Sequence, residues 1–179
     1  KKISPFENIP LLDLIVKTGI GDAITQQLGS MGGNQDAVAE TIENNVRKKI
    51  IKERLGDPEF YDRMSQLLDE IIQARRTKQL EYAEYLKKIA ELAKQVQTAQ
   101  TEDTPPTLDT PGKRALYNNL SKNETLALQI DDAVKRSRPD DWRGVKTKEN
   151  KIKQALFGVL GSEDAVEKVF EIIKAQREY

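Results

Sequence analysis

The stretch Asp36-Ala-Val-Ala-Glu-Thr-Ile-Glu-Asn-Asn-Val-Arg-Lys-Lys-Ile-Ile-Lys-Glu-Arg54 decides the fold. Four aliphatic residues recur in it at every fourth position, which places them on one stripe of an α-helix: Val38, Ile42, Val46 and Ile50. Acidic residues fill its first half and basic residues its second half, so the charges complement the helix dipole at both ends. The stretch therefore predicts a long helix with one buried face.

Helical periodicity also dominates the rest of the chain, and no segment alternates apolar and polar residues as a strand would. Glycine and the capping residues Ser, Thr and Asp mark the expected helix ends. Helices are expected to end at Gly19, Gly56 and Gly161, and to begin at Ser4-Pro-Phe-Glu7, Asp57-Pro58, Thr110-Pro111, Ser121-Lys-Asn-Glu124 and Ser162.

A polar segment divides these helices into two groups. Residues 99–110 are rich in Thr, contain the pair Pro105-Pro106 and show no apolar period, which is typical of a linker. We therefore expect an all-α helical bundle of two packed lobes, with residues 1–98 as the N-terminal lobe, 99–110 as a Thr/Pro-rich linker and 111–179 as the C-terminal lobe.

Composition restricts the chemistry that this chain can perform. It contains neither His nor Cys, which excludes Ser–His and Cys–His catalysis, thiolate or imidazole zinc sites, and disulfides within these residues. Lys and Arg number 29 and so do Asp and Glu, and a formal net charge of zero argues against a uniformly basic nucleic-acid binder. No apolar run is long enough to span a bilayer. We expect a soluble cytoplasmic protein that does not contact a membrane.

Two sequence features invite a catalytic interpretation, and neither fits the chemistry. The glycine-rich loop Gly29-Ser-Met-Gly-Gly33 is followed by Asn34-Gln35, where a Walker phosphate loop has Lys and Ser or Thr. Acidic pairs occur at Asp69/Glu70, Asp131/Asp132 and Asp140/Asp141, and we expect them on solvated helix faces or in a turn. The sequence thus predicts no catalytic, cofactor-binding or metal-binding residue.

Two basic stretches are candidates for contacts with partners. Arg47–Arg54 lies at a helix C-terminus, where cations are already expected, and we assign Lys48, Lys49 and Lys52 to docking of a protein partner. The second set crowds the start of a later helix, where the dipole attracts anions and lysines would add to a phosphate site. Its members are the candidate DNA phosphate contacts Arg143, Lys146, Lys148 and Lys151. Trp142 is expected to be a packing anchor, and the apolar surface around it is a further candidate for docking.

Several stretches resemble a known protein family when they are read in order. They are Asn44-Asn-Val-Arg-Lys48 in the opening helix, Tyr61–Arg76, Tyr85–Val96, Pro111–Leu120, Asp140-Asp-Trp-Arg-Gly144 and Ile173–Tyr179. Together they resemble the C-terminal helical region of the motor/restriction (R) subunit of type I restriction-modification enzymes. The resemblance extends from about Gln35 to the end of the chain. The first residue is not Met, and we expect the chain to be a fragment of a longer protein.

The resemblance implies a division of labour between this region and its parent chain. The parent would carry a nuclease domain and two ATP-driven helicase lobes that use ATP and Mg²⁺, and would work in a bacterial or archaeal cytoplasm. This region would be non-catalytic and would dock the translocase and endonuclease onto the methyltransferase core of modification and specificity subunits. Double-stranded DNA is an additional expected contact.

Two other interpretations remain open at this stage. The chain could be a helical DNA-binding module that holds duplex near the motor, or a free-standing helical adaptor. The net charge of zero favours docking over DNA binding.

Overall fold

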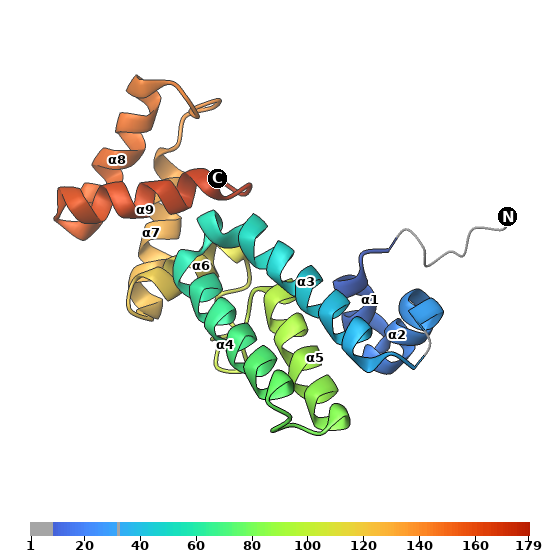
Figure 1. The fold of residues 1–179 in the computed structure, drawn as a ribbon. Helices are drawn as coiled ribbons and strands as arrows, with labels where there is room; N and C mark the ends of the chain where they lie inside the picture. The colour runs from blue at the N-terminus through green and yellow to red at the C-terminus, as the bar shows by residue number, and fades with distance from the viewer. Residues whose placement is uncertain (1–8, 32) are drawn as a thin grey trace, which may run out of the picture. The chain divides into compact units, whose positions relative to one another are not determined.

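The computed structural model describes residues 9–31 and 33–179, and every regular element in those ranges is a helix (Figure 1). The α-helices are α1 (Leu11–Thr18), α2 (Ile20–Leu28), α3 (Gln35–Glu53), α4 (Pro58–Arg76), α5 (Tyr82–Thr98), α6 (Pro111–Asn119), α7 (Glu124–Ser137), α8 (Lys146–Leu160) and α9 (Glu163–Ala175), with short 3₁₀ turns η1 (Gly29–Met31) and η2 (Arg54–Gly56). The predicted all-α class is confirmed. The expected start at Ser4–Glu7 lies outside the described residues. In the described ranges, no helix combines the length and apolar character needed to cross a bilayer.

The chain forms two compact units whose boundaries differ from the expected lobes. Unit 1 contains the residues up to Lys52 and Tyr61–Gln100, and unit 2 contains Glu53–Phe60 and Thr101–Tyr179. The turn between α3 and α4, which we expected in the first lobe, therefore belongs to unit 2. One reason is a hydrogen bond in which Gln176 Nε2 donates to the Gly56 carbonyl over 2.6 Å.

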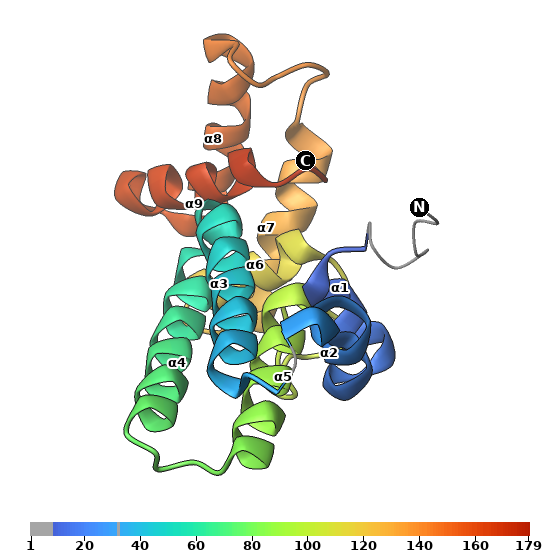
Figure 2. The same cartoon turned by 45° about the vertical axis from the view of Figure 1, so that its right-hand side comes forward.

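In unit 1, helices α3, α4 and α5 lie side by side in both views (Figures 1 and 2). The Tyr61 hydroxyl at the start of α4 donates to the Val96 carbonyl near the end of α5, over 3.5 Å, so these helices are antiparallel. Arg75 at the end of α4 reaches Asp36 at the start of α3, so this pair is antiparallel too. The aliphatic residues Val38, Ile42, Val46 and Ile50 of α3 are at most 3% exposed, because they face this bundle.

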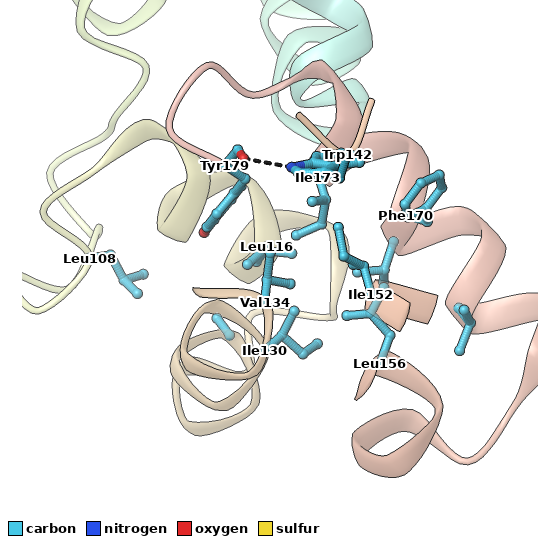
Figure 3. Packing of buried hydrophobic residues seen from close by; sticks show 13 residues of the cluster. Leu108, Leu116, Ile130, Val134, Trp142, Ile152, Leu156, Phe170, Ile173 and Tyr179 are labelled. Carbon is cyan, nitrogen blue, oxygen red and sulfur yellow. Dashed lines mark hydrogen bonds between the residues drawn. The ribbon is translucent and has the colours of Figure 1, made fainter. Parts of the chain in front are cut away.

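In unit 2, helices α6 to α9 surround one hydrophobic core, drawn in Figure 3. The longest helices contribute Ile130 and Val134 from α7, Ile152 and Leu156 from α8, and Phe170 and Ile173 from α9, each at most 2% exposed. The core therefore draws on residues far apart in the sequence.

The segment that we expected to be a free linker is anchored to unit 2. Leu108 is only 2% exposed and belongs to the hydrophobic core of that unit. Arg114 Nη1 donates to the Leu108 carbonyl over 3.1 Å, and the Thr107 hydroxyl bonds the Glu124 carboxylate. A single leucine gives no periodic signal, which is why sequence analysis did not find this anchor.

Most of the expected helix ends agree with the structure. Gly19 and Gly161 adopt positive φ angles of 89° and 68° after α1 and α8, and the Ser162 hydroxyl accepts from Ala165 N at the start of α9. The expected cap at Ser121 is wrong. Its φ of 55° is left-handed, whereas an N-cap needs extended backbone, and Asn123 caps α7 instead by accepting from Leu126 N.

Candidate functional site

The candidate docking lysines lie on α3 in unit 1, and they differ in accessibility. Lys48 and Lys52 are exposed, whereas Lys49 is half-buried. The neighbouring Arg47 is committed to Asp69 on α4, with 2.6 Å between Nη2 and Oδ1. Lys48 and Lys52 are thus the cations of this helix that a partner could reach most easily.

Sequence analysis missed an exposed aliphatic side chain between these lysines. Ile51 is 68% exposed, although its neighbour Ile50 is buried. Residues three and four apart on a helix are surface neighbours, so Lys48, Ile51 and Lys52 share one face. We call these three residues the α3 stripe. The signal was present in the sequence as an isoleucine one position outside the buried period.

The candidate DNA contacts at the start of α8 in unit 2 are partly committed within the fold. Arg143 donates from Nε to the Lys174 carbonyl over 3.2 Å and from Nη2 to the Gln176 carbonyl, so it caps the end of α9. Its guanidinium also lies 4.4 Å from the Trp142 ring centroid. Lys148 Nζ donates to the Asp140 carbonyl over 2.7 Å. Both side chains thus bond backbone carbonyls of unit 2 and stabilise the fold around the start of α8.

Lys146 and Lys151 are exposed, and within the described part of the chain neither forms an ion pair. The same helix terminus already holds an internal anion. Glu149 accepts a hydrogen bond from Gly144 N over 3.0 Å and pairs with Lys174 at 3.4 Å. The Gly144 hydrogen bond lowers the pKa of Glu149, so this carboxylate is charged beside the predicted phosphate site. Of the four predicted contacts, two remain available to DNA.

Trp142 is the packing anchor that we expected and is not a docking surface. It is 3% exposed, its Nε1 donates to the Tyr179 carbonyl over 2.8 Å, and its ring centroid lies 5.7 Å from that of Phe170 (Figure 3). Burial of the indole leaves it out of reach of a partner. The prediction of docking through Trp142 is therefore corrected for the indole itself, and docking through the surface around it stays a prediction.

Unit 1 contains a buried charged cluster that sequence analysis did not find. Glu43, which is 4% exposed, accepts two hydrogen bonds from Arg75, at 2.8 Å from Nε and 3.0 Å from Nη2. The Tyr85 hydroxyl also donates to Glu43, over 2.7 Å. Burial and this hydrogen bond raise the pKa of Tyr85, and the Glu43 hydrogen bond raises that of Arg75. The three side chains satisfy one another and tie α3, α4 and α5 together.

Unit 2 buries two further carboxylates. Asp131 is 6% exposed and accepts from the Tyr179 hydroxyl and from Lys135, which corrects our expectation that all the acidic pairs are solvated. Asp57 is 5% exposed and accepts from Phe60 N, Asn118 Nδ2 and Asn119 Nδ2 over 3.2, 2.9 and 2.7 Å. Burial, only partly offset by these hydrogen bonds, raises the pKa of Asp57 to about 6. Each buried carboxylate is thus engaged in packing.

In the ranges that the structure describes, no group of His, Cys, Asp or Glu side chains is arranged to hold a metal ion. Comparisons of the chain with protein-family models, curated proteins and solved structures find no match.

Proposed function

We propose that this chain is a non-catalytic assembly domain that docks an ATP-dependent DNA translocase and endonuclease onto its methyltransferase core. The parent would be the R subunit of a type I restriction-modification enzyme, as the sequence resemblance implies. The partners are the modification and specificity subunits, and ATP and Mg²⁺ belong to the parent chain.

The α3 stripe is the observation that carries this proposal. Ile51 is 68% exposed, and transfer of its side chain from water to the surface of a partner would lower the free energy. The flanking Lys48 and Lys52 would meet carboxylates on that partner, which gives orientation and speeds association. An apolar residue framed by reachable cations suits a protein surface better than the uniformly charged backbone of DNA.

The buried acids support a binding role as well. Glu43, Asp57 and Asp131 all accept hydrogen bonds from neighbouring side chains. A general base needs a free carboxylate within reach of a substrate proton. These three carboxylates instead hold helices together.

Charge reversal on the α3 stripe tests the proposal. The variant Lys48→Glu/Lys52→Glu should weaken binding to the purified modification–specificity complex by about tenfold or more, since two attractive contacts become repulsive. Titration calorimetry measures the affinity, and circular dichroism verifies that the variant remains helical. The matched control is Lys146→Glu/Lys151→Glu, which reverses two exposed lysines of unit 2 and should leave the affinity unchanged. Equal losses in both variants would contradict docking through α3.

Auxiliary DNA contact is the second candidate function, favoured by the exposed and unpaired Lys146 and Lys151. Two phosphate contacts should change the slope of log K against log salt by about 1.8. The variant Lys146→Gln/Lys151→Gln should remove that part of the salt dependence of duplex binding and spare the methyltransferase. An unchanged salt slope would leave docking as the function of the chain.

A further inference from the structure

A groove between α8 and α9 in unit 2 combines an exposed aromatic side chain with unpaired acids. Phe157 on α8 is 49% exposed, whereas Ile152 and Leu156 of the same helix are buried in the core. It lines a hollow of about 600 Å³ together with Asn150 and Gln154 of its own helix. The opposite wall, from α9, carries Glu163, Asp164 and Glu167. We call this hollow the Phe157 groove.

The charge of the groove is not neutralised from within. Lys153 is its one cation, and its Nζ pairs with Glu167 at 3.1 Å while lying 4.8 Å from the Phe170 ring centroid. Lys153 thus holds α8 to α9. Glu163 and Asp164 form no ion pair with any residue that the structure describes. The groove therefore presents two unpaired carboxylates beside the half-exposed side chain of Phe157.

Helix stability explains only part of this arrangement. Glu163 and Asp164 stand in the first turn of α9, where the helix dipole favours acidic residues. The helix dipole does not explain why Phe157 is exposed to water, since burial of a phenyl ring is strongly favourable. The exposed ring and the adjacent carboxylates together favour a ligand that has both an apolar group and positive charges.

We propose that the Phe157 groove binds a cationic amphipathic helix of a protein partner, one that carries a large aliphatic residue between lysines or arginines. The aliphatic side chain would cover Phe157, and the cations would pair with Glu163 and Asp164. The distance along α8 from Asn150 to Phe157 is seven residue steps, about 10 Å, which matches about two turns of a docked helix. Nucleic acid does not fit, because its phosphates would meet carboxylates. This surface is separate from the basic α3 stripe and does not depend on the function proposed above.

A defined probe tests this proposal on the whole chain. It is a fluorescent, alanine-based helical peptide of about 16 residues with one leucine, a lysine one turn before it and a lysine one turn after it. Binding is followed by fluorescence anisotropy. Phe157→Ala, and separately Glu163→Gln/Asp164→Asn, should each weaken binding by about tenfold, and added salt should weaken it further. A peptide with glutamates in place of the lysines should not bind.

The matched control is Glu171→Gln, which removes an exposed carboxylate of α9 outside the groove and should leave binding unchanged. Fluorescence of the buried Trp142 verifies that every variant keeps a folded unit 2. Peptide binding that Phe157→Ala leaves intact would overturn the proposal, and so would the absence of binding. Displacement of the peptide by duplex DNA would overturn it too. Self-association of the chain that Phe157→Ala abolishes would assign the groove to a second copy and also overturn the proposal.

Discussion

At the scale of single residues, Glu43 and Arg75 form a buried ion pair in unit 1. Their side chains are 5% and 12% exposed, so the Glu43 carboxylate would have little access to water if Arg75 were removed. A buried pair contributes little net stability, but removal of one member leaves an uncompensated charge in the interior. We predict that Arg75→Met lowers the free energy of unfolding by about 3–5 kcal/mol.

Urea unfolding followed by far-ultraviolet circular dichroism measures this loss. The control is Arg47→Met, which breaks an ion pair whose side chains are 38% and 65% exposed and should cost less than about 1 kcal/mol. A loss in Arg75→Met no larger than that of the control would mean that water reaches Glu43.

Asp57 gives unit 2 a pH dependence whose sign follows from its burial. Its pKa is about 6 in the folded chain against an ordinary 3.8, so between these values the folded form holds a proton that the unfolded form has lost. The free energy of unfolding should therefore fall as pH rises from about 4 to 6, by up to about 3 kcal/mol, and level off above that. Asp57→Asn should remove this component.

Trp142 is the only tryptophan of the chain and lies in the same unit, so its fluorescence during urea unfolding reports the effect. Other groups also titrate in this range, and the difference between the original chain and Asp57→Asn isolates Asp57. Identical pH profiles for the two proteins would show that Asp57 is not the cause.

At the scale of elements, the segment before α6 is anchored in unit 2 by Leu108 and by the hydrogen bonds of Thr107 and Arg114. Leu108 is 2% exposed in the core, and truncation of such a residue typically costs about 2–5 kcal/mol. We predict a loss in this range for Leu108→Ala, measured by Trp142 fluorescence. Leu55→Ala removes a leucine that is 74% exposed in the same unit and should change stability by less than about 0.5 kcal/mol.

Limited proteolysis provides a second test of how Leu108 anchors this segment. The first cleavage of the chain is expected between Gln97 and Thr110, and an exposed residue suited to a glutamyl endoprotease is Glu102. Leu108→Ala should accelerate this cleavage, because it releases the anchor. An equal cleavage rate in both proteins would mean that Leu108 does not hold the segment.

Most helix ends and the buried aliphatic face of α3 could be predicted from the sequence, because caps and periodicity are local signals. Contacts between distant residues could not. Asp57 meets Asn118 and Asn119 across about sixty positions, and Trp142 meets Tyr179 across 37. For the same reason Arg143 was assigned to a DNA-contacting surface, since its structural partners at the end of α9 have no signature near it in the sequence.

At the scale of the whole molecule, a net charge of zero conceals local surfaces of opposite sign. Lys48 and Lys52 frame an exposed isoleucine on α3, whereas Glu163 and Asp164 stand beside an exposed phenylalanine at the α8–α9 pair. Both surfaces join apolar area to reachable charge, the combination that protein interfaces use for affinity and orientation. This distribution is what we would expect of a chain whose task is assembly.

Sedimentation velocity of the unmodified chain, mixed with the purified modification–specificity complex, tests the central claim most directly. We predict that the chain sediments with the complex at micromolar concentrations, and that Lys48→Glu/Lys52→Glu releases it while Lys146→Glu/Lys151→Glu does not. A chain that sediments alone under these conditions, and that instead sediments with duplex DNA, would contradict the docking function.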